Sequence, residues 1–94
     1  PSTIFCINDP IAMGAMQALL DAEIKVPEDV SIIGFNDVEA CNFTRPTLST
    51  VYAPSFEMGE IGASVLHHMI TGDDIHYPRR IQLPCQLKIR NSCK

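Results

Sequence analysis

Two pairs of polar residues carry the side chains most able to bind a ligand, and each pair directly follows an apolar segment. Asn8-Asp9 comes after the apolar run 3–7, and Asn36-Asp37 comes after the apolar run 30–35. An asparagine amide donates and accepts hydrogen bonds at once, which suits sugar hydroxyls or the edge of a purine. The chemistry that these residues favour is therefore recognition of a small polar molecule. The competing interpretation is ordinary capping and turn formation, because Asn and Asp are common in both settings.

No arrangement of residues predicts catalysis, and we expect no catalytic residue, no metal site and no cofactor. No glycine-rich loop follows a strand, so neither dinucleotide nor P-loop binding is supported. His67 and His68 are adjacent on a predicted helix and point about 100° apart, so they cannot hold one metal ion as a pair four residues apart does. The four cysteines have no CxxC spacing. We expect them to be free thiols in a reducing cytosol, with Cys6 and Cys85 as small core residues.

Length and charge narrow the possible classes of protein. The chain has 94 residues, of which 46% are hydrophobic, and its formal net charge is −4. This length fits one domain at most, and the apolar content is too high for a disordered chain. No apolar run approaches the roughly 20 residues that cross a bilayer, and no signal peptide is expected at residues 1–4. The negative charge argues against electrostatic binding of nucleic acid by this segment.

The elements that must position the polar pairs form a strand, helix and strand. Residues 3–7 predict a strand buried on both faces, and residues 30–35 predict a second one. Between them, residues 11–22 predict a helix, with Asp9 as its N-cap and Pro10 in the first turn. Such a unit pairs its strands in parallel, and ligands bind beyond the carboxyl ends of parallel strands. We therefore expect the two polar pairs to lie side by side.

The remaining residues predict a strand, a helix and two edge strands. Residues 48–53 are strand-like, and a helix from Ser55 to Thr71 ends at Gly72. A polar connection covers residues 73–78, and Pro84 separates the predicted edge strands 80–83 and 86–90. Three glycines inside the helices are expected to mark close backbone packing, namely Gly14, Gly59 and Gly62.

An ordered series of motifs resembles the C-terminal part of LacI/GalR-family transcriptional regulators over essentially the whole chain. The most specific pair is VPEDVSIIGFND at 26–37 followed by PTLSTV at 46–51. The others are FCINDPIAMGAM at 5–16, EMG at 57–59 and LPCQLKIRNS at 83–92. The resemblance implies an α/β, periplasmic-binding-protein-like fold, with a mostly parallel sheet and flanking helices. It also implies a sensor whose two subdomains close on a small effector, usually a sugar or nucleobase.

The resemblance places effector contacts at three positions. Asn8 matches a family contact after a strand, and Asn36 matches a position that is an Asp in many members. Tyr52-Ala53 replaces the basic residue and Gln often found after the TTV-like strand, so the contact there is expected to move to Tyr52. Because asparagine-rich strand ends suit networks of hydroxyl groups, the effector is expected to be a carbohydrate.

The resemblance further implies that residues 1–94 are a C-terminal fragment of the effector-binding domain. Residues 1–53 and 85–92 would belong to the C-terminal subdomain and residues 54–84 to the N-terminal one, with the helix-turn-helix headpiece absent. Operator DNA would be bound only through that headpiece, in a cytoplasmic homodimer without membrane contact. The candidate dimer surface contains Met13, Met16 and Phe43.

Two other functions compete with a repressor's sensor. A periplasmic sugar-binding component of a transporter has the same fold, and a helix-turn-helix or a signal peptide in the parent's first ~60 residues would separate the two. An enzyme of the doubly wound class is the third, but no constellation of residues in this sequence supports it.

Overall fold

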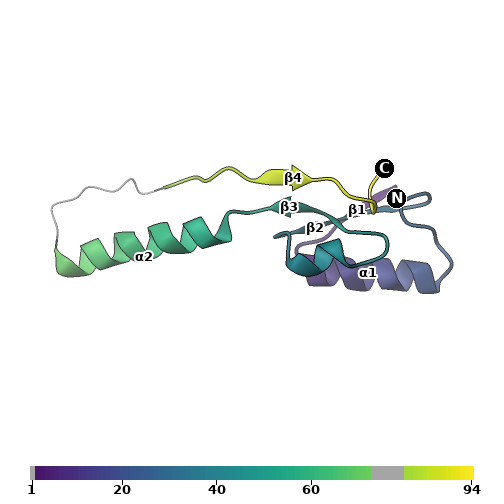
Figure 1. The fold of residues 1–94 in the computed structure, drawn as a ribbon, viewed down its shortest axis with the longest axis horizontal. Coiled ribbons are helices and arrows are strands. Elements are labelled where there is room, and N and C mark those ends of the chain that lie inside the picture. The colour runs from purple at the N-terminus through teal and green to yellow at the C-terminus, as the bar shows by residue number, and fades with distance from the viewer. Residues whose placement is uncertain (1, 73–79) are drawn as a thin grey trace. The chain divides into compact units, whose positions relative to one another are not determined.

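The described residues of this computed structural model, 2–72 and 80–94, contain a four-stranded sheet and two α-helices (Figure 1). They divide into two units, each described here by itself. Unit 1 comprises Pro1–Ala53 and Cys85–Lys94, and unit 2 comprises Pro54–Pro84. The predicted connection 73–78 lies outside the described residues. The assignment of the units to two subdomains of a larger protein stays a prediction.

Unit 1 is built on a mixed sheet whose spatial order follows the order of its strands in the sequence. The strands are β1 (Thr3–Phe5), β2 (Ser31–Phe35), β3 (Ser49–Tyr52) and β4 (Gln86–Lys88). β1 and β3 each pair with β2 in parallel, and β4 pairs with β3 in antiparallel orientation. The α/β class and the predicted βαβ unit are confirmed.

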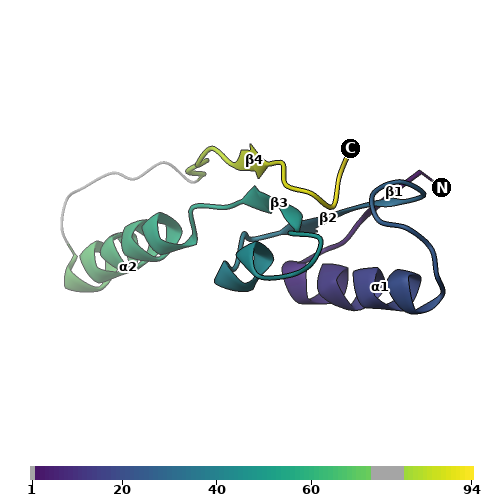
Figure 2. The same ribbon diagram turned by 45° about the vertical axis from the view of Figure 1, so that its right-hand side comes forward.

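Helix α1 (Asp9–Asp21) connects β1 to β2 and packs on one face of the sheet (Figure 2). Its apolar side, with Ala12 and Met16, meets Ile32 of β2 and Leu48 just before β3. These residues and their neighbours form the core of unit 1. The core forms because the alanine-rich helix can approach the β-branched strand closely.

Ser92 links β2 and β3 through hydrogen bonds of its side chain. Its hydroxyl donates to Ile32 O (2.7 Å) and accepts from Ser49 N–H (2.8 Å). Its backbone carbonyl accepts from Ile32 N–H at 2.9 Å, and its backbone N–H donates to Thr47 O at 2.9 Å. These four hydrogen bonds satisfy the hydroxyl, the carbonyl and the N–H of Ser92 inside the protein, which explains how a serine is fully buried here.

Unit 2 contains helix α2 (Ser55–Thr71), which ends where the sequence predicts. Gly72 follows it in the left-handed conformation, with φ 73°, a geometry that glycine adopts without steric cost. None of the residues of α2 is fully buried.

Several expectations about individual elements are wrong. β1 covers only Thr3–Phe5 and is not buried on both faces, since Thr3 and Phe5 are exposed and Ile4 is half-buried. It is an edge strand of the sheet, because only β2 pairs with it. The second predicted edge strand is shorter, Gln86–Lys88, and residues 80–83 form no strand. At Gly14, Gly59 and Gly62, apart from chain neighbours and the surrounding helix backbone, no described atom lies within 4 Å of where a Cβ would be, so close packing does not explain these glycines.

Gly34 of β2 is the glycine that close packing does require. A Cβ there would lie 3.1 Å from Asp9 Cα and 3.2 Å from Ala12 Cβ, and it would collide with the Asp9 carboxylate. We therefore predict that Gly34→Ala lowers the free energy of unfolding by about 1–3 kcal/mol, as overpacked cores do.

The matched control is Gly14→Ala, in an open helical position, which should leave stability unchanged or raise it by up to about 1 kcal/mol. Urea denaturation followed by circular dichroism measures both variants. Equal stabilities for the two variants would contradict the close approach of α1 to β2.

Candidate functional site

The three residues expected to contact an effector come from one edge of the sheet. Asn8 follows β1, Asn36 follows β2, and Tyr52 is the last residue of β3. These strands are parallel, so their carboxyl ends meet at the same edge. Phe35 is in register with Val51, and Asn36 N–H donates to Val51 O at 2.8 Å. The structure thus brings Asn36 beside the end of β3.

Asn8, not Asp9, is the N-cap of α1. Its backbone is extended, with φ −152°, and its Oδ1 accepts a hydrogen bond from Ile11 N–H at 2.9 Å. Capping therefore uses the carbonyl side of the Asn8 amide. The expectation that Asp9 caps the helix is wrong, because the chain enters the helix one residue earlier.

Asp9 instead turns its side chain into the protein and is fully buried. Its Oδ2 accepts from Val38 N–H at 2.8 Å, and its Oδ1 accepts from the Thr50 hydroxyl at 2.6 Å. The residue also lies in the first turn of α1, where the positive end of the helix dipole favours a negative charge. One carboxylate therefore links α1, β3 and the loop after β2.

Asn36 and Asp37 both have positive φ, at 108° and 56°. Residues other than glycine rarely take this conformation, which costs about 1–3 kcal/mol each and persists only where surrounding contacts enforce it. Asn and Asp tolerate it better than most residues. These two residues turn the chain sharply at the carboxyl end of β2. The Asn36 side chain is exposed at this turn.

Arg90 holds Asp37 from the segment after β4. Its Nη2 lies 2.8 Å from Asp37 Oδ1, and its Nη1 donates to Leu48 O at 2.9 Å. Both side chains are largely buried, with 19% of Arg90 and 16% of Asp37 exposed. The Asp37 charge is therefore neutralised within the protein, and the exposed group of this loop is the uncharged Asn36 amide.

Tyr52 is half-buried and lies beside a cation. Lys88 Nζ is 5.9 Å from the centre of its ring, within the range of a cation–π contact. Tyr52 and Gln86 are partners in the antiparallel pairing of β3 and β4. The phenol ring is thus held at the edge where β3 ends.

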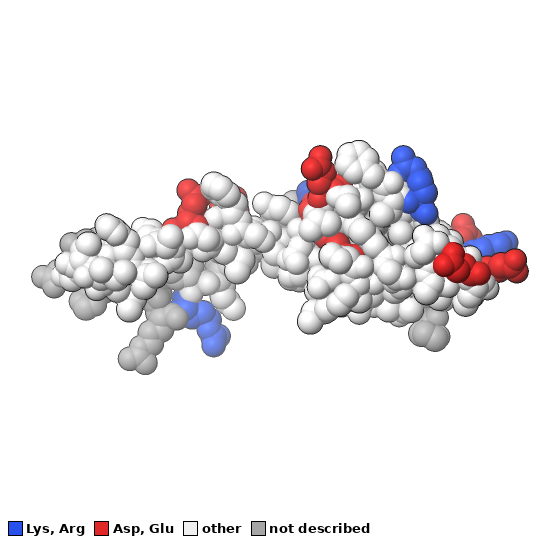
Figure 3. Space-filling view, turned by 90° about the horizontal axis from the view of Figure 1, so that it is seen from below, with Lys and Arg blue, Asp and Glu red and all other residues white. Residues whose placement is uncertain are grey.

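The three residues expected at a dimer surface differ in exposure. Phe43, which follows the 3-10 helix η1 (Glu39–Asn42), is 70% exposed. Met13 is half-buried, and Met16 is 4% exposed and belongs to the core, so Met16 offers almost no surface to a partner. Figure 3, seen from the side on which α1 lies, shows that most of the visible surface is neither acidic nor basic. Other large apolar side chains of unit 1 are exposed too, namely Phe5, Ile7, Ile11, Val38, Leu87 and Ile89.

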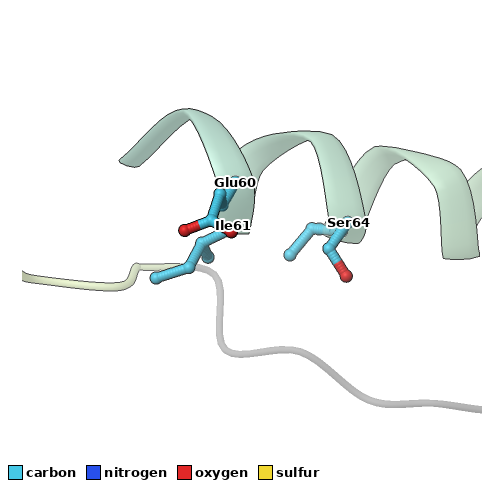
Figure 4. Close-up of a pocket in the computed structure, with 4 residues that line it drawn as sticks. Glu60, Ile61 and Ser64 are labelled. Carbon is cyan, nitrogen blue, oxygen red and sulfur yellow. The ribbon is translucent and has the colours of Figure 1, made fainter. Parts of the chain in front are cut away.

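The described residues contain neither a metal-ligand cluster nor a helix long and apolar enough to cross a membrane. The rings of His67 and His68 meet edge to face, with centroids 5.9 Å apart. A hollow of about 420 Å³ lies along α2, lined by Glu60, Ile61, Ser64 and Val65 (Figure 4). These four residues all belong to α2.

All four cysteines are free thiols. Cys6 is buried as expected, but Cys85 is exposed, and Cys41 is the second buried thiol. Burial raises the pKa of Cys41 to about 12, and the adjacent Asp9 carboxylate adds to this rise. Burial also raises the pKa of Cys6.

Comparisons with known proteins agree on one family. Residues 1–93 match the periplasmic-binding-protein-like domain family. The chain is 40% identical over 92 residues to the ribose operon repressor of Escherichia coli strain K12, covering 98% of this chain and 28% of the repressor. It thus spans less than a third of the length of this relative.

Solved structures give the same result. A LacI-family regulator from Enterococcus faecium with bound ribose shares 32% identity, with a TM-score of 0.85 over 98% of this chain and 34% of its own. The lac repressor dimer bound to operator and the anti-inducer ONPF shares 26% identity, with a TM-score of 0.86 over 99% of this chain and 32% of its own. These relatives are transcriptional regulators, not transport proteins.

The raised pKa of Cys41 predicts a clear order of thiol reactivity. At pH 8 a thiol with a pKa near 12 is ionised to only about one part in ten thousand, and the thiolate is the reactive form. We expect iodoacetamide to label exposed Cys85 first and to label Cys41 only after unfolding. Peptide mass spectrometry measures both.

In Cys85→Ser, the fast-labelled peptide should disappear while the slow labelling of Cys41 stays the same. Equal labelling rates for Cys41 and Cys85 in the native protein would show that Cys41 is not enclosed as the structure has it.

Proposed function

The chain belongs to the LacI family of transcriptional regulators, within their periplasmic-binding-protein-like domain, and from this premise we propose that it senses a small effector and supports dimerisation in a repressor. The observation that carries the proposal is the shared strand edge of Asn8, Asn36 and Tyr52. Binding there would change the affinity of a separate headpiece for operator DNA, which is a coupling between distant sites. The chain itself performs no chemistry in this proposal, and it acts in the cytoplasm, where the operator is.

The chemistry of the edge favours a carbohydrate. Asn36 presents an exposed amide, Asn8 has its amide NH₂ left to donate, and Tyr52 provides a ring and a hydroxyl. Uncharged donors and acceptors beside an aromatic ring match the hydroxyls and the apolar face of a sugar. The Asp37 carboxylate is paired with Arg90, so it adds no net charge for the ligand. The relative from Enterococcus faecium contains bound ribose, which makes D-ribose the first probe.

The proposed dimer surface consists of Phe43 and Met13, with Met16 supporting them from the core. Phe43 is exposed, and unit 1 has further exposed large apolar side chains, and apolar surface of this kind is often covered by a partner. The lac repressor, to which this chain is similar, is a dimer on its operator.

The effector proposal predicts a loss of sugar affinity in Asn36→Ala. In the complete regulator, isothermal titration with D-ribose should show affinity weaker by about tenfold, because about 1.4 kcal/mol of hydrogen bonding is lost. The matched control is Asn42→Ala, which removes an exposed amide of η1 that is not among the proposed effector contacts and should bind as the wild type does.

The same titration is run with other sugars and with guanine. Binding of guanine with no response to any sugar would contradict a carbohydrate effector. Unchanged affinity in Asn36→Ala would remove this residue from the site.

The dimer proposal predicts that Phe43→Asp weakens self-association of the complete regulator by at least about tenfold, because a charge would be buried in an apolar contact. Sedimentation velocity across a concentration series measures the effect. Phe43→Leu keeps an apolar side chain and should stay dimeric. A Phe43→Asp protein that dimerises like the wild type would place the interface elsewhere.

A further inference from the structure

The loop that carries Asn36 has three successive backbone N–H groups, and each donates to an acceptor outside the loop. The acceptors are Val51 O for Asn36 (2.8 Å), the Thr50 hydroxyl for Asp37 (3.2 Å) and Asp9 Oδ2 for Val38 (2.8 Å). A loop with two consecutive positive-φ residues would relax to another conformation without such contacts. These bonds therefore determine where the Asn36 amide lies.

The position of the Thr50 hydroxyl proton determines the direction of the hydrogen bond between Asp37 N–H and the Thr50 hydroxyl. The hydroxyl has one hydrogen, which it donates to Asp9 Oδ1 at 2.6 Å. Its lone pairs are then turned toward Asp37 N–H. Thr50 and Asp9 are both fully excluded from solvent, so water cannot replace either partner. The buried carboxylate thus orients the hydroxyl, and the hydroxyl holds the loop.

Arg90 contacts the same loop from the segment after β4. Its guanidinium pairs with Asp37, and its backbone N–H donates to Ser49 Oγ at 2.7 Å. Arg90 therefore belongs to the sheet through its backbone and to the loop through its side chain. Asp37 is held at both its backbone and its carboxylate.

We propose that Thr50 and Arg90 are positioning residues for the effector site, holding the loop 36–38 in the conformation that presents Asn36. Neither residue needs to touch the effector. The expected change in effector affinity rests on the proposed function. The expected change in the conformation of loop 36–38 does not depend on any ligand. A preorganised loop binds more tightly because little ordering remains to be done on binding.

The test compares three variants of the complete regulator. Thr50→Val removes the hydroxyl and keeps the shape, whereas Thr50→Ser restores the hydroxyl. Thr47→Val removes a hydroxyl that accepts from Asn91 N–H and does not contact the loop. Amide hydrogen exchange is measured without ligand, and D-ribose affinity is measured by calorimetry.

In Thr50→Val, the amide of Asp37 should exchange at least about tenfold faster, while amides in the middle of α1 keep their rates. D-ribose affinity should fall by about tenfold. Thr50→Ser should recover most of both losses, and Thr47→Val should change neither. Unchanged exchange at Asp37 in Thr50→Val would overturn the inference, as would an equal acceleration throughout unit 1, since that indicates only lost stability.

A double-mutant cycle tests Arg90 separately. Arg90→Gln and Asp37→Asn should each accelerate exchange at residues 36–38, and the double variant should match either single variant, because both remove the same ion pair. Additive effects would overturn the role of the pair. If the wild type binds no sugar, the proposed function fails, whereas the exchange measurements still decide the positioning role.

Discussion

The carboxylate of Asp9 is the group on which the arrangement of unit 1 depends. A charge without solvent exposure is destabilising by several kcal/mol unless hydrogen bonds and local dipoles compensate it. Asp9 receives this compensation from Val38 N–H, the Thr50 hydroxyl and the start of α1. Three segments far apart in the sequence must therefore be in place together for the charge to be tolerated.

The same carboxylate explains features of its neighbours. Gly34 has no side chain because the backbone of Asp9 passes too close to β2 for a Cβ. The high pKa of Cys41 reflects burial first and then the adjacent negative charge. The sharp turn at Asn36-Asp37 is held where Val38 N–H reaches the carboxylate. A single buried acid thus limits the size of Gly34, adds to the raised pKa of Cys41 and holds the loop after β2.

Patterns local in the sequence predicted the elements well. β-branched runs located β2 and β3, and the helical repeat with its terminal glycine located α2. The motif series identified the family and the α/β fold. The wrong predictions concerned features that depend on neighbouring strands in space. β1 is at an edge because of the strand order of the sheet, and residues 80–83 alternate like a strand but pair with no other strand. Asn8 and Asp9 are both good capping types, so their order alone could not tell which one caps.

The candidate site was predictable only in part. The parallel pairing of β1 with β2 was predicted, and the loop that follows Asn36-Asp37 does contact Asp9. The contacts that hold this edge were missed because they join ordinary polar residues separated by 41 positions, as in the bond from Thr50 to Asp9. Two features could have indicated them: an acidic residue directly after the capping asparagine, and a glycine within the neighbouring buried strand.

The bonds of Ser92 have a consequence for how the protein is made. Its hydroxyl joins residues 43 and 60 positions earlier in the chain, so β2 and β3 lack their final partners until residue 92 has left the ribosome. Contacts between such distant positions slow folding, because a long loop must close before they form. During translation β2 and β3 therefore stay without these bonds until Ser92 is available. Unpaired strands of this kind make a nascent chain prone to aggregate in that interval.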